Sequence, residues 1–433
     1  MVRTRLAATA VATGMLAAAA PAQAQDLTNI AQNNPGDTAW VLTASLFTLL
    51  ITLPGLVLYY AGQVRAKNAL SVGLQVAAIT SIVSVLWIMV GYTLAFGDTV
   101  GGVIGNGRAW MLTGLTILRD GMSIPESTYV LFQMGLAIMA PALVVGAWVD
   151  RARFGWVVAF CGFWSLLVYA PVAHWIWGGG WLGGLGVVDK AGGLIVHTTA
   201  GVSALVVALL MGKRLQGKPG AHSPALMLAG AALLWVGFLA RNGVPSLTAT
   251  DDASAAMLNT HLAGAVSALA WLLVEKISRG KSTVSGFATG FLAGLVTITP
   301  SADLVSPGGA ILIGIVGALV CFWMSNLVRT RLPIDDTLGV FALNGVCGML
   351  GTLLLGLFAW QGLGGAGYTS ASAIPLALGV QAMGVAVVAL YSAFVTAIIA
   401  VGVSLFIPMR VSEEEEREGL DTSSHGERGW DFD

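Results

Sequence analysis

The stretch "AGGLIVHTTAGVSALVVALLM" at residues 191–211 decides the fold class of this chain. It is long enough to cross a bilayer as a helix, and almost every side chain in it is apolar. The exception is His197, which lies a third of the way along. A titratable side chain inside a membrane span is costly to bury, so it indicates either a substrate pathway or a polar contact between helices.

The composition of the whole chain also indicates a membrane protein. Of its 433 residues, 56% are hydrophobic and only 10% are charged, which leaves too few polar groups to cover a water-soluble surface. The net charge of −1 gives no indication of a nucleic-acid partner. Because Cys161, Cys321 and Cys347 lie in apolar runs without CxxC spacing, the sequence predicts neither a disulfide framework nor a metal site.

The first 24 residues have the layout of a cleavable signal peptide. Arg3 and Arg5 precede a short apolar run, and "AQA" at residues 22–24 supplies the small residues of a cleavage site. An uncleaved anchor helix is the alternative, although the run is short for a span. The predicted domains are therefore a signal peptide at 1–24, a transporter domain at 25–410 and an acidic cytoplasmic tail at 411–433.

Apolar runs of about 20 residues predict an all-α membrane protein with eleven transmembrane helices. The runs begin near Trp40, Leu70, Thr128, Phe154, Ala191, Pro224, Ala253, Val284, Gly308, Thr337 and Leu376. Eleven divides as five, five and one, which predicts two inverted five-helix repeats and a final helix.

Basic residues alternate between the connections and predict the orientation. One set of connections is rich in Lys and Arg, whereas the other set holds only Arg108, Arg119, Lys190 and Arg241. By the positive-inside rule the N-terminus lies outside and the C-terminus lies in the cytoplasm. We therefore expect a multi-pass protein of the bacterial inner membrane.

The fifth and tenth spans carry similar polar positions. His197 is followed four residues later by Gly201, and Asn344 by Gly348, so each pair lies on one helix face. If these spans are related by an inverted repeat, His197 faces Asn344 near the middle of the bilayer. Such a pair is either part of a pore or a polar contact that holds two helices together.

Several motifs together resemble the Amt ammonium transporters of the Amt/Rh family, and the resemblance covers the whole mature chain. They are "DTAWVLTASLFTLLITLPGLVLYYAGQVRAKNAL", "IPESTYVLFQ", "PVAHWIWGGGWLGGLGVVDKAGGLIVHTTAG", "WVGF", "NGVCG" and "EEEEREGLDTSSHGERG". The resemblance implies a homotrimer in which each subunit has its own pore, an ammonium or ammonia substrate, and no cofactor.

Three site residues of the family are intact in this sequence. Trp177 matches the tryptophan of the outer ammonium site, where its ring face would attract the cation, although an interfacial anchor is the alternative role. Asp189 matches the nearby aspartate and is better placed to cap the following helix than to touch the cation. His197 matches the first pore histidine.

Other positions depart from the family pattern. Phe238 in "WVGF" matches one gating phenylalanine, but the second falls on Leu136. The segment "FLARNGVPSL" carries an insertion, so Ser246 is the candidate for the cation-binding serine. The second pore histidine is Asn344, which does not titrate near neutral pH, and a proton relay through two imidazoles is therefore broken.

The acidic tail allows two interpretations. It is either a solvated, disordered terminus or, as the resemblance implies, an ordered segment that packs under a neighbouring subunit and cooperates with a PII-type regulator. Gly419, Leu420 and Trp430 favour order.

The predicted function is transport of ammonium or ammonia across the inner membrane. The cation would be captured at the outer aromatic site and ammonia would pass through an apolar pore. The alternatives are a poorly conducting ammonium sensor and a channel for another small neutral molecule. Nothing in the sequence indicates an enzyme, because no catalytic triad, HExxH pattern or phosphate-binding loop is present.

Overall fold

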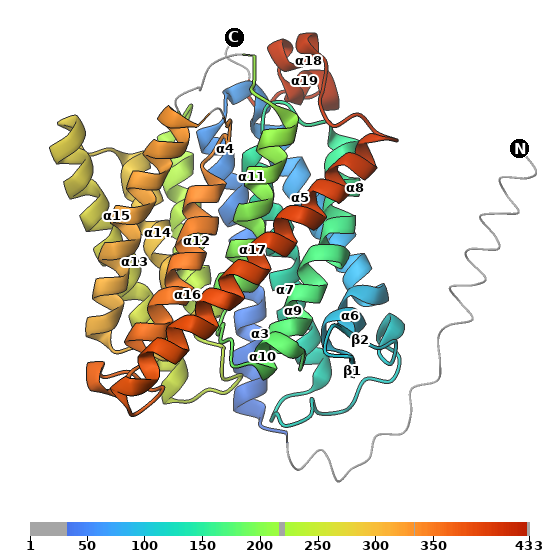
Figure 1. Ribbon diagram of the computed structural model, residues 1–433. Helices are drawn as coiled ribbons and strands as arrows, with labels where there is room; N and C mark the ends of the chain where they lie inside the picture. The colour runs from blue at the N-terminus through green and yellow to red at the C-terminus, as the bar shows by residue number, and fades with distance from the viewer. Residues whose placement is uncertain (1–32, 216–220, 333, 431–433) are drawn as a thin grey trace, which may run out of the picture.

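The computed structural model describes residues 33–215, 221–332 and 334–430 (Figure 1). The predicted signal peptide at 1–24 lies outside these residues. The described chain is mainly helical, and its two strands, β1 (Thr99–Val100) and β2 (Ile104–Gly105), form a small antiparallel hairpin.

Ten helical segments in the described ranges are long and apolar enough to cross a membrane. Several consist of α-helices joined through a π-helical turn, written η. They are α3 (Pro35–Leu50) with η1 (Ile51–Leu56) and α4 (Val57–Gln63); α5 (Ala69–Leu86) with η3 (Trp87–Gly91) and α6 (Tyr92–Phe96); α7 (Glu126–Val144); α8 (Phe154–Trp164) with η6 (Ser165–Tyr169), α9 (Ala170–Trp177) and α10 (Trp181–Gly184); η7 (Gly193–Thr198) with α11 (Thr199–Met211); α12 (Pro224–Asn242); α13 (Asp251–Arg279); α15 (Pro307–Arg331); η8 (Phe341–Val346) with α16 (Cys347–Phe358); and α17 (Ile374–Ser404).

Each of the eleven apolar runs in the sequence corresponds to a helix. The run that begins near Val284 forms α14 (Val284–Ile298), which has 15 residues and is shorter than a typical span. The all-α membrane fold is therefore confirmed, whereas the count of eleven spans stays a prediction.

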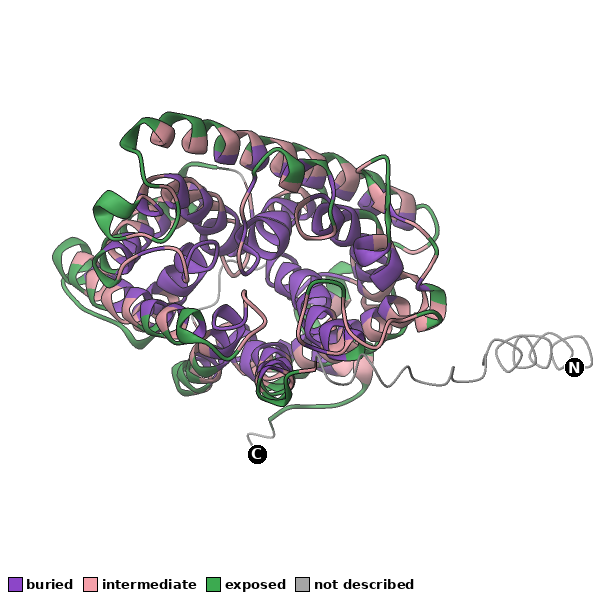
Figure 2. Cartoon of the chain, turned by 90° about the horizontal axis from the view of Figure 1, so that it is seen from below, coloured by how far each residue is buried: buried purple, intermediate pink, exposed green. Residues whose placement is uncertain are grey.

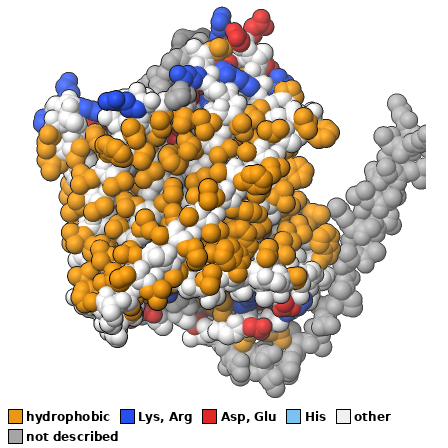
Figure 3. Space-filling view, in the orientation of Figure 1, with side chains coloured by type: hydrophobic (Ala, Val, Ile, Leu, Met, Phe, Trp, Pro, Cys, Tyr) orange, Lys and Arg blue, Asp and Glu red, His pale blue; other side chains and the backbone are white. Residues whose placement is uncertain are grey.

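The helices point their buried faces inward and their exposed faces outward (Figure 2). The outward side chains form a broad apolar band, and Lys and Arg gather at the end of the molecule that carries α18 (Glu413–Glu418) and α19 (Leu420–His425) (Figure 3). We call this the tail end. An apolar outer belt with charges confined to the ends is what a bilayer requires.

Helix ends follow local sequence signals. Ser223 caps α12 by accepting a hydrogen bond from the Leu226 amide, and Pro224 occupies the first helical position. At the C-terminus of α13, Gly280 has φ +79°, a left-handed conformation that glycine adopts at helix ends.

The fifth and tenth spans cross at the centre of the bundle. A Cβ atom at Gly201 would lie 2.0 Å from the Gly345 amide nitrogen, and a Cβ at Gly348 would lie 3.0 Å from the Cβ of His197. The glycine of each span therefore lets the backbone of the other approach, as in small-residue helix packing. This reciprocal contact agrees with the predicted correspondence of the two spans.

The acidic tail is ordered against connections of its own chain at the tail end. Ser412 and Glu415 form a capping box at the start of α18, and the Asp421 carboxylate accepts hydrogen bonds from the amides of Leu70 and Ser71 at the start of α5. Residues 412–425 therefore do not form the solvated, extended terminus that their composition allows.

Candidate functional site

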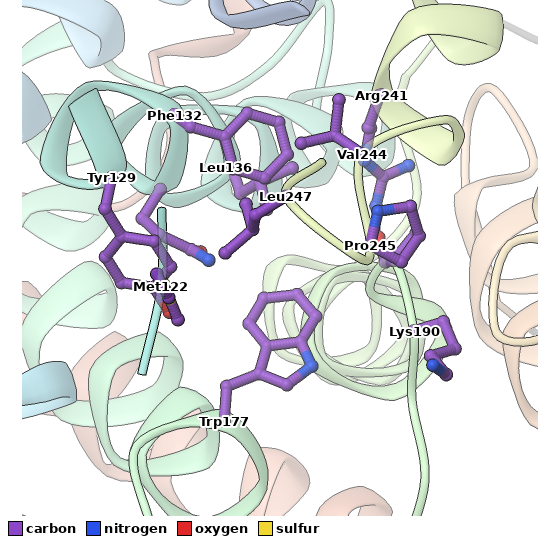
Figure 4. A pocket seen from close by; sticks show the side chains of 12 residues that line it. Met122, Tyr129, Phe132, Leu136, Trp177, Lys190, Arg241, Val244, Pro245 and Leu247 are labelled. Atoms are coloured by element: carbon purple, nitrogen blue, oxygen red, sulfur yellow. The ribbon is translucent and has the colours of Figure 1, made fainter. Parts of the chain in front are cut away.

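A pocket of about 190 Å³ (Figure 4) lies near the end of α9, at the end of the bundle opposite the tail end (Figure 1). We call it the vestibule. Leu136, Trp177 and Arg241 line it. The others that line it are Met122, Tyr129, Phe132, Gln133, Lys190, Ala191, Val244, Pro245 and Leu247.

Trp177 projects its indole into the vestibule from the end of α9 (Figure 4). Its Nε1–H donates to the Asp189 carbonyl at 2.5 Å, which fixes the ring. An indole held in this way presents a defined face to a cation in the pocket. The structure thus brings Trp177 into the vestibule, and its role in binding ammonium stays a prediction.

Asp189 caps the fifth span through four hydrogen bonds. Its Oδ1 accepts from the amides of Gly192 and Gly193, and its Oδ2 accepts from those of Leu194 and Ile195. Burial raises the pKa of this carboxyl above its ordinary value, and the four amide donors act in the opposite direction. The carboxylate is thus a helix cap, as expected. It does not line the vestibule and acts on it only through its electrostatic field.

The turn that presents these amides depends on glycine. Gly192 has φ +102°, and a Cβ there would lie 2.8 Å from Nη2 of Arg241. Both the left-handed backbone and the lack of space exclude a larger side chain.

The predicted contact between the two central polar residues is present. His197 Nδ1 lies 2.9 Å from Asn344 Oδ1, and His197 is fully buried. Asp189 and Asp336 precede these residues by eight positions each, and Asp336 accepts from the amides of Val340 and Phe341 as Asp189 does at the other span. The spacing of these aspartates was a repeat signal that the sequence analysis missed.

Arg241 is the main residue of this site that sequence reasoning misplaced. The charge count put it in an outer connection, but it lies inside α12 and is only 1% exposed. Its Nη1 lies 3.1 Å from His197 Nε2, its Nη2 donates to the Ala191 carbonyl, and its guanidinium lies 5.2 Å from the centre of the Phe238 ring. The error arose because loop counting assigns a charge near a helix end to water, whereas α12 continues to Asn242.

The Arg241 contact assigns the protonation of His197. A guanidinium only donates, so Nε2 of His197 is the acceptor of this hydrogen bond. The proton of the neutral ring then resides on Nδ1 and is donated to Asn344 Oδ1. Both ring nitrogens are therefore engaged, and neither is free to take up a proton from a substrate.

His197 contacts both Asn344 and Arg241, and we call these three residues the central layer. Aromatic side chains border it. The Phe238 ring stacks on His197 with centroids 5.7 Å apart and planes inclined by 22°. Leu136 lines the vestibule at the expected gate position, and Phe132, one turn earlier on α7, lines it as well. An aromatic ring from α7 thus remains at the mouth despite the leucine.

Ser246 is less well placed. Its neighbours Pro245 and Leu247 line the vestibule, but Ser246 is not among the lining residues, and its buried hydroxyl has no hydrogen-bond partner in the described part of the chain. A role in binding the cation stays a prediction.

A second cavity of about 20 Å³ lies on the other side of the central layer from the vestibule, and we call it the inner cavity. Phe238 and Asn344 line it together with apolar side chains and two tyrosines, Tyr59 and Tyr60. This volume is enough for one water-sized molecule. Between residues 33 and 430, in the described ranges, no cluster of His, Cys, Asp and Glu has the geometry to hold a metal ion.

Comparisons with known proteins find relatives that match most of the chain. The sequence model described as Ammonium Transporter Family matches residues 39–430. The chain is 40% identical to the ammonium transporter of Bacillus subtilis (strain 168), covering 91% of this chain and 98% of that protein. It is 38% identical to the ammonium transporter of Aquifex aeolicus (strain VF5), covering 93% and 95%.

Two solved structures resemble the whole bundle. A structure described as a Sensor Amt Protein matches with a TM-score of 0.85 at 28% identity, over 90% of this chain and 98% of that one. Mep2 of Saccharomyces cerevisiae matches with a TM-score of 0.82 at 30% identity, over 88% and 89%.

Proposed function

The chain belongs to the ammonium transporter family, and from this premise we propose that it collects ammonium at Trp177 and passes neutral ammonia through the centre of the bundle. The observation that carries the proposal is the order of the vestibule, the His197 layer and the small apolar cavity behind it. The chain is 40% identical to the ammonium transporter of Bacillus subtilis (strain 168), so the sensor alternative is not favoured.

The energetics favour passage of the neutral form. A bare cation in an apolar pore is destabilised by tens of kcal/mol when nothing compensates its charge. Removing the proton of ammonium at neutral pH costs only about 3 kcal/mol, because its pKa lies roughly two units above neutrality. The proton then stays on the outer side, since His197 has no free ring nitrogen to carry it.

The orientation, assembly and regulation belong to the same proposal. Lys and Arg gather at the tail end, which supports a cytoplasmic C-terminus in a bacterial inner membrane (Figure 3). The exposed apolar face of α17, with Leu376, Leu390 and Phe394, is available to lipid or to neighbouring subunits of a homotrimer. The docked tail offers a surface to a PII-type regulator.

We expect Trp177→Leu to weaken apparent ammonium affinity. The aromatic face contributes about 0.5 to 2 kcal/mol, so the concentration for half-maximal uptake should rise by about two- to thirtyfold. Uptake into proteoliposomes, followed by the rise of internal pH as ammonia gains a proton, measures this and tests the proposed function. Trp177→Phe retains a ring without the N–H and should be less affected, and Trp181→Leu outside the vestibule is the matched control. Wild-type affinity in Trp177→Leu would show that the indole is only an anchor.

We expect truncation after Arg410 to slow transport without preventing insertion. The truncation removes Glu416, which contacts Arg410 and the Leu215 amide, and Asp421, which caps α5. Without Asp421 the first amides of α5 lose their acceptor, which destabilises this end of the helix. Uptake normalised to the amount of protein in the membrane measures the effect, and Glu413→Gln on the exposed side of α18 is the control. Unchanged uptake and regulator binding would favour a passive tail.

A further inference from the structure

Arg241 lies between the vestibule and the His197–Asn344 contact, and Asn344 lines the inner cavity. Arg241 lines the vestibule and contacts His197, while Phe238, three residues earlier on the same helix, lines the inner cavity. A substrate that leaves the vestibule for the inner cavity therefore passes a fixed positive charge.

We propose that Arg241 determines specificity as a tethered cation that excludes ammonium, methylammonium and potassium from the centre of the pore and admits neutral ammonia. The proposal rests on the proposed function, because it names which form of the substrate passes. It assigns the selection to a single side chain that the family comparison did not indicate.

Charge balance supports this role. Asp189 is the buried carboxylate at this end of the fifth span, and Lys190, which also lines the vestibule, is paired with Asp303 at 3.0 Å. Arg241 and Asp189 together contribute no net charge. A cation beside Arg241 would add a second positive charge among apolar side chains. The repulsion between this cation and the guanidinium is weakly screened there.

Hydrogen-bond chemistry supports the same selection. Every N–H of Arg241 is a donor, and the lone pair of His197 Nε2 already accepts from Nη1. The Nε–H of Arg241 is buried without a partner in the described ranges. Ammonia has a lone pair that can accept from this N–H, whereas ammonium has none and meets only donors. The central layer thus favours the neutral molecule by the direction of its hydrogen bonds as well as by charge.

The test measures current and internal pH in parallel on proteoliposomes that hold the full chain. Wild type should show a rise of internal pH on an ammonium pulse with little current, and no current with potassium or methylammonium. Arg241→Met removes the charge at similar length, so its cation current should exceed that of wild type by about tenfold or more. Arg241→Lys keeps the charge and should conduct as little as wild type. Arg108→Met removes a positive charge at the same end but outside the vestibule, and it should leave the current unchanged.

Each outcome separates the two claims. Absence of a pH rise in wild type, relative to protein-free vesicles, would refute the proposed transport. A normal pH rise with a large potassium or methylammonium current in wild type would refute the role of Arg241, and this measurement does not depend on whether a variant folds. An Arg241→Met protein that moves ammonia but carries no more current than wild type would also overturn it.

Discussion

Asp189→Asn is expected to cause the largest loss of stability in this protein, and Arg241→Met in the same chain is expected to restore part of it. The substitution replaces a carboxylate that accepts four amide hydrogen bonds by an amide with one acceptor oxygen. It also removes a buried negative charge that attracts the buried guanidinium of Arg241. Each buried amide that loses its acceptor typically costs about 1 to 3 kcal/mol.

The two substitutions form a double-mutant cycle. If Asp189 and Arg241 balance each other, the double variant should be more stable than the sum of the single effects predicts, by about 0.5 to 3 kcal/mol. Thermal unfolding of the detergent-solubilised protein measures the four members of the cycle. Asp252→Asn, on the exposed start of α13, is the control for loss of a carboxylate. Strictly additive effects would mean that Arg241 is not compensated by Asp189.

The second large effect concerns the broken histidine pair. We expect Asn344→His alone to leave the charge moved per ammonia near zero, because Arg241 still occupies Nε2 of His197. Asn344→His combined with Arg241→Met frees that nitrogen and supplies a second titratable ring. The double variant should therefore move up to about one charge per ammonia, if protons pass between the two rings.

The comparison of current with internal pH measures this ratio in both variants. Asn344→Gln, combined with Arg241→Met, is the control because it keeps an amide at the position. A rise of the charge ratio in Asn344→His alone would contradict the account and mean that Arg241 does not block the relay.

Much of the central site followed from the sequence because it depends on local patterns. The spacing of His197 and Gly201, repeated at Asn344 and Gly348, predicted which residues meet where the two spans cross. The location of Asp189 before an apolar run predicted its role as a cap, since free amides at a helix start need acceptors.

The remaining features depend on where a helix ends in three dimensions. Arg241 follows an apolar run and precedes "NGVPS", so its sequence context is the same for a loop residue and for the last turn of a buried helix. Its burial is stabilised by His197, the Ala191 carbonyl and the Phe238 ring, none of which is near it in sequence except Phe238. Phe132 was likewise overlooked because the family pattern pointed to the position one turn later.

The voltage dependence of ammonia influx in wild-type proteoliposomes shows whether Arg241 restricts the pore to the neutral molecule. A unit charge that crosses the membrane gains or loses about 2.3 kcal/mol per 100 mV, which is enough to change a rate many-fold. If Arg241 restricts the pore to neutral ammonia, the initial rate of internal pH rise will be the same at zero potential and at about 100 mV, inside negative. An influx that increases steeply with the inside-negative potential would mean that the cation passes Arg241 and that the pore does not select neutral ammonia.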